Sequence, residues 1–438
     1  MHYRNNHWTH RPHTDKTSLA RKFFWGTAIS SFQIEGHIEN DFTEWEKLGK
    51  FVHNNEKVMY ENGSNHWMMW EDDFKLMKKL NVNAYRFSFE WARIEPRRNT
   101  FDRKALDQYE RMVDWLLKHQ IEPFLTIHHF THPTWFHEYS PWHDEKSKDV
   151  FLNYVDKIVR IFKDRIKYFI TFNEVLVWVM AGYGEGNFPP GHKNLDLMIN
   201  ALYNILKTHR ETYDLIKSYN ENAEVGVAKH FIVFKRARDW FFLDKEVQNR
   251  IHYFFNVMEL DAFKNNILSC SLPPLLKFEK EIDLDNKIDF WGINYYYRLY
   301  TKFKFSLKNP FYFYTKNPQT DTGWEIYPKG LYKIIKLVST YRKKMFITEN
   351  GIATQDDELR KKFIKRHIKF LIKAIENGFN VQGYFYWSLI DNYEWLFGKS
   401  KRFGLISVDY EKNFERHITQ NGYYYSQLIS KYHEKVSM

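Results

Sequence analysis

The chain of 438 residues is long enough for one large domain or for two to three smaller ones, and its composition, 43% hydrophobic and 27% charged, excludes a disordered chain and a membrane protein. The formal net charge of +11 does not indicate nucleic-acid binding, because lysine and arginine are spread along the chain and no zinc-finger or RNA-recognition motif accompanies them. The single cysteine, Cys270, excludes an intrachain disulfide.

The first residues are polar and rich in histidine. Residues 1–16 contain no apolar run that would form a signal peptide or a membrane span, so we expect a flexible N-terminal extension there and a cytoplasmic protein. No Gly/Ser-rich or Pro-rich linker interrupts the rest of the chain. Residues 17–438 are therefore predicted to form a single domain.

Apolar runs of strand length recur along the chain, each rich in β-branched or aromatic residues. The eight predicted strands span residues 23–31, 83–91, 122–130, 168–175, 223–231, 289–298, 345–351 and 381–390. Longer segments with helical periodicity lie between them, at residues 70–80, 103–119, 147–165, 195–219, 328–342 and 356–377.

The alternation of apolar strands with amphipathic helices indicates a parallel sheet covered by helices. In residues 147–165, for example, Phe151, Tyr154, Val155 and Ile158 keep the three- and four-residue spacing of one buried stripe. Eight units fit a closed barrel, and an open doubly wound sheet is less favoured because no glycine-rich phosphate turn follows the first strand. The sequence therefore predicts an α/β fold, a single (β/α)8 TIM barrel.

Two predicted strands end in a glutamate. The fourth ends in TFNE, with Glu174 last, and the seventh ends in TENG, with Glu349 second. The C-terminal ends of barrel strands are where active sites lie. A single glutamate at a strand end is more often a salt-bridge partner, but two at equivalent ends indicate glycoside hydrolysis, in which one carboxyl donates a proton and the other attacks or activates water.

Other strand ends carry side chains that suit a ligand with many hydroxyl groups. On the sixth strand, Asn294 and Tyr296 are two residues apart, so both point to one face while Tyr295 points to the other. Amides and carboxylates bind hydroxyls, and indoles pack against the C–H face of a sugar ring. Further candidates lie in or just after strands one, two, three and eight: Gln33 follows the first, Arg86 lies within the second, His129 closes the third, and the eighth leads into Trp387, Glu394 and Trp395.

Two other chemistries are less favoured. His128, His129 and His132 would suit a metal, but no HExxH motif and no zinc-ligand spacing accompanies them, so we expect neither a metal nor a cofactor. The GxSxG motif of a Ser-His-Asp hydrolase is absent as well.

Eight ordered blocks carry specific motifs: FFWGTAISSFQIEG from Phe23, NAYRFSFEWARIEP from Asn83, HHFTHPTWF from His128, TFNEV from Thr171, DFWGINYYYR from Asp289, TGWEIYPKGL from Thr322, ITENG from Ile347 and YFYWSLIDNYEWLFGKSKRFGL from Tyr384. With these blocks the chain resembles glycoside hydrolase family 1, the retaining β-glucosidase and β-galactosidase family, from about Phe23 to Tyr424.

The resemblance implies a catalytic pair. Glu174 corresponds to the acid/base and Glu349 to the nucleophile, while Arg86 and Tyr296 orient Glu349 by hydrogen bonds. An adjacent guanidinium keeps a carboxylate ionised, as a nucleophile requires. Asn173 would bind the sugar 2-hydroxyl, a contact that strengthens in the transition state.

The resemblance also implies which residues bind the rest of the substrate. Gln33, His129, Glu394 and Trp395 would bind the other hydroxyls of the non-reducing sugar, next to Asn294 on the sixth strand. Trp387 would form the floor under the sugar ring, and Trp324 in TGWE would be the platform for the aglycone.

The chain departs from the family pattern at three positions. Val175 follows the acid/base where proline is usual, which implies a less rigid turn. Phe130 stands where the common HWDLP block has a tryptophan, so the indole N–H is missing. Lys399 replaces a common tyrosine.

The expected substrates are small-molecule β-glycosides or oligosaccharides. A carboxylate at Glu394 would repel a 6-phosphate, which favours unphosphorylated, terminal non-reducing β-D-glucosyl residues, with galactosyl and fucosyl as co-substrates. A β-mannosidase, and a catalytically silent sugar-binding member of the family, are the alternatives; the presence of both glutamates disfavours the silent one. We expect no nucleic-acid or membrane partner, and the sequence predicts neither the natural aglycone nor the oligomeric state.

Overall fold

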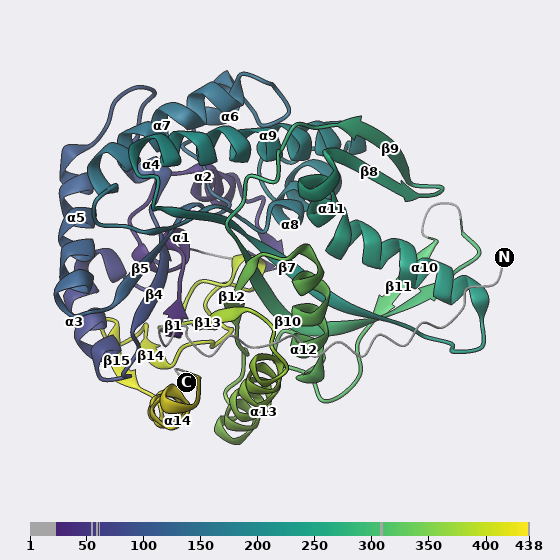
Figure 1. The fold of residues 1–438 in the computed structure, drawn as a ribbon. Helices are drawn as coiled ribbons and strands as arrows, with labels where there is room; N and C mark the ends of the chain where they lie inside the picture. The colour runs from purple at the N-terminus through teal and green to yellow at the C-terminus, as the bar shows by residue number, and fades with distance from the viewer. Residues whose placement is uncertain (1–22, 54–55, 58–59, 61, 307–309, 437–438) are drawn as a thin grey trace.

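The computed structural model describes residues 23–53, 56–57, 60, 62–306 and 310–436. Eight parallel strands form its central sheet (Figure 1): β1 (Phe24–Ala28), β4 (Ala84–Ser88), β5 (Glu122–His128), β6 (Tyr168–Asn173), β7 (Glu224–Arg236), β10 (Phe290–Phe303), β12 (Lys344–Asn350) and β13 (Val381–Trp387). Their order is β10-β12-β13-β1-β4-β5-β6-β7, and β10 also pairs with β7, which closes the barrel. The predicted (β/α)8 barrel and its eight strands are confirmed.

The expected N-terminal extension, residues 1–16, lies outside the described residues. That residues 17–438 form one domain stays a prediction. Among the described residues, no helix is both long and apolar enough to cross a membrane.

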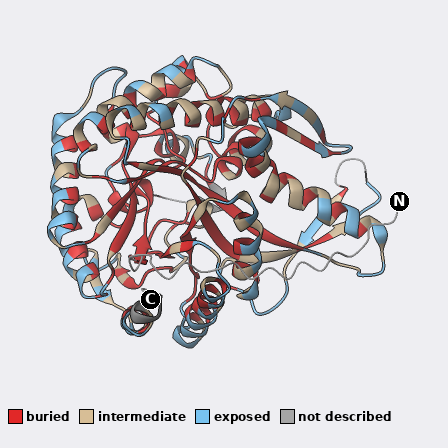
Figure 2. Cartoon of the chain, in the orientation of Figure 1, coloured by how far each residue is buried: buried red, intermediate tan, exposed pale blue. Residues whose placement is uncertain are grey.

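Helices surround the barrel and turn their apolar side chains toward it. The six predicted helices are present as α3 (His66–Lys78), α5 (Arg103–Lys118), α7 (Ser147–Phe162), α9 (Leu195–Tyr219), α12 (Lys329–Val338) and α13 (Asp357–Glu376). Side chains of Asp102, Asn194 and Asp356 accept hydrogen bonds from free backbone N–H groups at the starts of α5, α9 and α13. Figure 2 shows the same helices buried on the inner side and exposed on the outer side.

Further elements fill the connections between strands and helices. The longer helices are α10 (Phe242–His252), α11 (Met258–Asn265) and α14 (Gln420–Val436); the short ones are α1 (Ser31–Glu35), α2 (Asp41–Lys47), α4 (Trp91–Ile94), α6 (Phe136–Tyr139) and α8 (Val175–Val179). The segments η1 (Met180–Glu185) and η2 (Tyr253–Val257) are π-helical, and η3 (Ser339–Tyr341) and η4 (Trp395–Phe397) are 3-10 helices. Three hairpins are formed by β2 (Val52–His53) with β3 (Glu56–Lys57), β8 (Ile267–Leu272) with β9 (Leu276–Glu281), and β14 (Ile406–Asp409) with β15 (Glu415–Ile418).

β7 and β10 run well past the barrel, which the apolar pattern did not predict. The predicted strands end at residues 231 and 298, whereas β7 continues to Arg236 and β10 to Phe303. After a register shift the two extensions pair with each other, and β11 (Phe311–Tyr314) pairs antiparallel with the end of β10. In β7 the buried apolar run continues through Ile232, Val233 and Phe234, so the predicted end at residue 231 is too early. In β10, Arg298 interrupts the apolar run before the strand ends.

Aromatic side chains fill the barrel below the strand ends. Phe24, Phe124, Tyr168, Phe346 and Phe385 come from five strands and are all buried. The rings of Phe124 and Tyr168 stack with centroids 4.2 Å apart, and Phe124 meets Phe385 at 4.8 Å. This layer closes the barrel from below, so the polar side chains at the C-terminal ends of the strands can surround a cavity without water reaching them through the barrel.

Candidate active site

A cavity of about 310 Å³ lies at the C-terminal ends of the strands and brings together the residues that the sequence singled out. Nine of the twelve line it: His129, Asn173, Glu174, Tyr296, Trp324, Glu349, Trp387, Glu394 and Trp395. The other three lie behind the wall and hydrogen-bond to lining residues, Gln33 to Glu394, Arg86 to Glu349 and Asn294 to Glu174. None of the twelve is separated from the rest.

Glu349 is held on both oxygens. Arg86 Nη1 contacts its Oε1, and the hydroxyl of Tyr296 donates to its Oε2 at 2.7 Å. Arg86 is itself fully buried, and its other nitrogens donate to Thr126 Oγ1 at 3.1 Å and to Asn173 Oδ1 at 2.7 Å. One guanidinium therefore connects β4 to the ends of β5, β6 and β12, and it fixes the position of Glu349.

Glu174 is held on one oxygen only. Asn294 Nδ2 donates to Oε1 at 2.7 Å, and Nδ1 of His230 lies 3.1 Å from the same oxygen. Thr348 Oγ1 donates to Asn294 Oδ1 at 2.6 Å, which fixes the amide with its nitrogen toward Glu174. Among the described residues Oε2 has no hydrogen-bond partner, so this oxygen remains for a ligand.

The backbone of Glu174 is strained. Its φ of 46° and ψ of 51° place it in the left-handed region, where a side chain costs about 1–3 kcal/mol. The residue ends β6, and α8 begins directly after it at Val175. Strain of this kind is tolerated where the position of a functional side chain depends on it, and here it places the carboxyl group in the cavity wall.

The two carboxyl groups have pKa values that differ in direction. Burial raises the pKa of Glu349 to about 7, although the charge of Arg86 opposes the shift. Burial also acts to raise the pKa of Glu174, but the charge of His230, hydrogen bonds from His230 and Asn294, and the charge of Arg86 outweigh it and lower the pKa below its ordinary value. The pair therefore shares one proton near neutral pH.

The charge on His230 decides which carboxyl group carries that proton. A positive His230 contributes the largest lowering of the Glu174 pKa, and this contribution vanishes when the imidazole is neutral. The guanidinium of Arg86 is in direct contact with Glu349 and not with Glu174. With a neutral imidazole we therefore expect Glu349 to be the ionised member and Glu174 the protonated one.

The far side of the cavity combines a carboxyl group with parallel rings. Gln33 and Asn392 donate to Glu394 Oε2 at 3.3 and 2.9 Å, and burial raises the pKa of Glu394 to about 8. The ring of His129 lies nearly parallel to Trp387 and Trp395, at 6.1 and 6.3 Å between centroids. Hydrogen-bonding groups next to flat apolar faces match the two surfaces of a sugar ring.

His129 is neutral and has a defined tautomer. Burial and the nearby charge of Arg86 hold its pKa well below the usual range. Asn173 Oδ1 accepts from Arg86 and Asn294, so its Nδ2, 3.3 Å from His129 Nε2, is the donor, and the ring hydrogen is on Nδ1.

The opposite wall is mostly apolar. Trp324 stacks on Tyr297 at 5.0 Å and lies 5.3 Å from Tyr296. The same wall includes Val177, Met180, Phe188, Ile232 and Phe255. These side chains come from the connections after β6, β7 and β10, apart from Ile232 in β7 and the two tyrosines in β10.

Two residues of this site escaped the sequence analysis. His230 lies within the predicted strand 223–231, and the rule that C-terminal strand ends carry functional side chains would have selected it. Tyr297 should point away from the cavity by strict alternation with Tyr296. It lines the cavity because the register of β10 against β7 shifts between Tyr295 and Arg298.

The buried histidines next to the site form a hydrogen-bond network. Asp41, His132 and His137 bring ligand atoms within 4.8 Å of one another, as in a metal site. However, Trp142 Nε1 donates to His132 Nε2 at 2.6 Å, so the ring hydrogen is on Nδ1 and donates to Asp41 Oδ2 at 2.9 Å. The lone pair that would bind a metal is therefore absent from that nitrogen, and the group suits a structural role.

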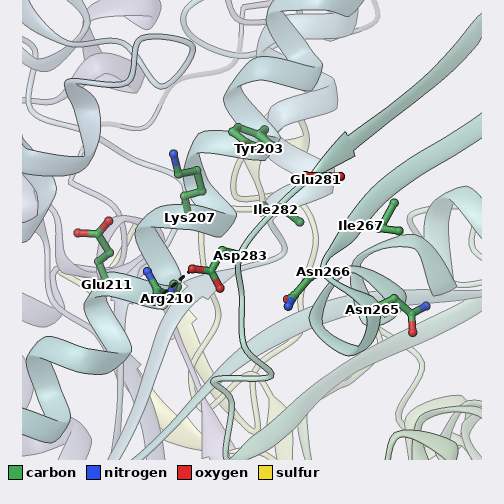
Figure 3. Close-up of a pocket in the computed structure, with 10 residues that line it drawn as sticks. All are labelled: Tyr203, Lys207, Arg210, Glu211, Asn265, Asn266, Ile267, Glu281, Ile282 and Asp283. Atoms are coloured by element: carbon green, nitrogen blue, oxygen red, sulfur yellow. Dashed lines mark ion pairs between the residues drawn. The ribbon is translucent and has the colours of Figure 1, made fainter.

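A larger cavity, about 780 Å³, lies beside α9 (Figure 3). Its other wall is formed by residues 265–267, where α11 leads into β8, and by residues 281–283, where the chain leaves β9. None of the twelve candidate residues lines it. Of the two cations that line it, Arg210 forms an ion pair with Asp283 at 3.3 Å (Figure 3), and Lys207 Nζ lies 5.5 Å from the centre of the Tyr203 ring. Size alone therefore does not identify the active site.

Comparison with known proteins agrees with the fold. Residues 15–434 match the model of glycosyl hydrolase family 1. The chain belongs to this family and is a β-glycosidase. It is 32% identical to β-glucosidase A of Thermotoga maritima over 93% of this chain and 96% of that one, and 28% identical to a 6-phospho-β-galactosidase of Clostridium acetobutylicum over 94% and 97%. The solved β-glycosidase of Pyrococcus horikoshii is similar with a TM-score of 0.85 and 34% identity, over 95% and 97% of the two chains.

Proposed function

We propose that this protein is a retaining β-glycosidase that removes terminal non-reducing β-D-glucosyl residues, with Glu349 as nucleophile and Glu174 as acid/base. The observation that carries the proposal is that the two carboxyl groups differ in how many of their oxygens are hydrogen-bonded by the protein. Both oxygens of Glu349 are held by Arg86 and Tyr296, whereas Glu174 keeps Oε2 without a protein partner among the described residues.

In the first step a carboxylate oxygen of Glu349 forms a bond to the anomeric carbon as the bond from that carbon to the aglycone oxygen breaks. The proton of Glu174 moves to the departing oxygen. In the second step Glu174 takes a proton from water, the water oxygen attacks the anomeric carbon, and the ester to Glu349 breaks. Asn173, held by Arg86 and Asn294, is placed to bind the 2-hydroxyl as charge develops.

The charges of the cavity favour an unphosphorylated sugar. Its described lining includes Glu174, Glu185, Glu349 and Glu394 and contains no lysine or arginine. A phosphate dianion would therefore enter a site without a cation on its wall and next to carboxyl groups. Because the wall has no lysine or arginine, this supports glucosides over 6-phosphoglycosides even at a pH at which Glu394 is protonated. Galactosides and fucosides are the proposed co-substrates.

The test is a panel of p-nitrophenyl β-glycosides ranked by kcat/KM, with glucoside, galactoside, fucoside, mannoside and 6-phosphoglucoside. We expect the glucoside to be among the best substrates and the 6-phosphoglucoside to be at least about a hundredfold worse, as for a charge placed without a partner. A higher value for the mannoside would favour the β-mannosidase alternative, and equal hydrolysis of the 6-phosphoglucoside would contradict the substrate class.

A further inference from the structure

His230 is a polar residue of the active site to which the proposed chemistry assigns no task. It lies near the end of the barrel portion of β7, is buried, and lines the cavity next to the apolar wall. Three rings fix its orientation: Tyr296 is stacked at 5.9 Å with 19° between the planes, and Phe255 and Tyr297 lie at 5.8 and 5.7 Å. A ring held in this way keeps Nδ1 toward Glu174.

The hydrogen bonds around Glu174 determine which of its oxygens can carry a proton. Asn294 Nδ2 is a donor, so Oε1 of Glu174 accepts one hydrogen bond whatever the protonation state. An Nδ1–H of a neutral His230 supplies a second donor to the same oxygen, 3.1 Å away. A proton on Oε1 would then face two N–H groups, so the proton must lie on Oε2, the oxygen without a protein partner among the described residues.

We propose that His230 is a positioning residue of the acid/base: as the neutral Nδ1–H tautomer it holds Oε1 of Glu174 and thereby keeps the transferable proton on Oε2, where the aglycone oxygen lies. The same N–H stabilises the carboxylate that Glu174 becomes between the two steps. This inference rests on the proposed function, because it assigns a task within the same reaction.

Other groups also act on the charge of Glu174, and the test must separate His230 from them. They are Tyr296 and Tyr297 on β10, Arg86 on β4, Glu349 on β12 and Glu394 after β13, in addition to Asn294 as a neutral donor. All of them stay in place in a variant of His230 alone.

Two substitutions isolate the N–H donor. His230→Asn keeps a nitrogen donor near the position of Nδ1, whereas His230→Leu keeps the bulk without a donor. We would measure kcat/KM, which reports the first step, for a series of aryl β-glucosides from dinitrophenol to unsubstituted phenol. The Leu variant should lose about tenfold on the phenyl glucoside, as expected for one lost hydrogen bond, and little on the dinitrophenyl glucoside, whose departure needs no acid.

The pH profile gives a second readout. Without the donor the ionised form of Glu174 is less stable, so the alkaline limb of kcat/KM should move to higher pH in His230→Leu and stay in place in His230→Asn. Ile232→Val is the matched control, because Ile232 lies two residues further along β7 and lines the same cavity with an apolar side chain. It should leave both the dependence on the leaving group and the alkaline limb unchanged.

The proposal would be overturned if His230→Leu reduced kcat/KM by one common factor for every leaving group, or if the Asn variant were as impaired as the Leu variant. Both outcomes would leave the glycosidase function intact. If the wild-type protein hydrolysed no aryl β-glycoside, the proposed function itself would fail. The nitrogen chemical shifts of His230 in labelled protein would then still decide the inference, since an Nε2–H tautomer contradicts it.

Discussion

The two carboxyl groups proposed as catalytic differ in what holds them, and this difference supports the tasks proposed for them. Arg86 and Tyr296 leave Glu349 little freedom, which suits an atom that must attack at a fixed angle. Glu174, with one oxygen free, can exchange a proton with a ligand and with water. The sequence placed both residues at strand ends, and the family resemblance implied that Arg86 contacts Glu349; the folded chain shows that contact.

A pair of alanine variants tests these assignments. In a retaining enzyme the carboxyl groups stand only about 5–5.5 Å apart, so one of them must attack the sugar directly. Glu349→Ala removes the nucleophile and opens space for azide on the α face, so a single displacement should give an α-glycosyl azide. Glu174→Ala should still load the enzyme from a dinitrophenyl glucoside, and azide, which needs no base, should then release a β-glycosyl azide.

The two products would be distinguished by NMR, with the wild-type protein and azide as control. Opposite anomers from the two variants are the expected result. Exchanged configurations would mean that the tasks of Glu174 and Glu349 are reversed, and undiminished activity in both variants would place the site elsewhere.

At the scale of elements, the ends of β12 and β13 approach more closely than any side chain would allow. A Cβ atom on Gly351, two residues after Glu349, would lie 1.7 Å from the carbonyl oxygen of Trp387. The close approach keeps β12, which carries the proposed nucleophile Glu349, next to Trp387, the tryptophan proposed as the floor of the sugar site. This glycine is required by the available space rather than by its φ angle.

Gly351→Ala should therefore push the two strand ends apart. We expect a loss of about 1–3 kcal/mol in the free energy of unfolding, as for other overpacked sites, together with a lower kcat from the displaced Glu349. Gly184→Ala is the control, since its nearest neighbour is the flexible sulfur of Met198 at 3.0 Å. Chemical denaturation and kcat/KM measured on both variants would check this, and a Gly351→Ala protein with unchanged stability and activity would contradict it.

The elements that the sequence predicted well are those with an uninterrupted pattern. The eight barrel strands are near-continuous apolar runs because helices cover one face and the packed barrel the other. The segment of α10 and α11 was not predicted, although its buried Val247, Ile251, Phe254 and Met258 keep a spacing of four, three and four. The bulge that brings Tyr297 into the cavity leaves no such pattern, and strict alternation gives the wrong face.

For the molecule as a whole, buried neutral histidines couple the fold to pH. Burial lowers the pKa of His209 to about 4 and that of His367 to about 3, from an ordinary value of 6.5. The folded state therefore binds fewer protons than the unfolded chain below pH 6.5. The stabilisation that comes from keeping these two histidines neutral is complete above pH 6.5, and it is lost as the pH falls toward their two lowered pKa values.

We expect the free energy of unfolding to fall by about 1.4 kcal/mol per pH unit for each such histidine in this range. His367 lies in α13, does not line the cavity, and has its ring 3.8 Å from that of Phe363, so His367→Leu should make the acid slope shallower by one proton. His417→Leu, at a side chain that is 63% exposed, should leave the slope unchanged. Urea denaturation between pH 7 and pH 5 measures the slopes, and equal slopes for all three proteins would rule out this origin of acid sensitivity.

The two halves of the cavity belong to different parts of the chain, and this separates two kinds of evolutionary change. Glu349, Asn173 and Trp387 lie at the ends of strands, and Glu174 directly follows one, so the closed barrel fixes the positions of these four proposed site residues. The apolar wall around Trp324 and Phe255 is carried largely by segments inserted between strands, which can vary in length and composition without opening the barrel. Selection, or a library confined to that wall, can therefore change which leaving group is accepted while the anomeric outcome is inherited unchanged.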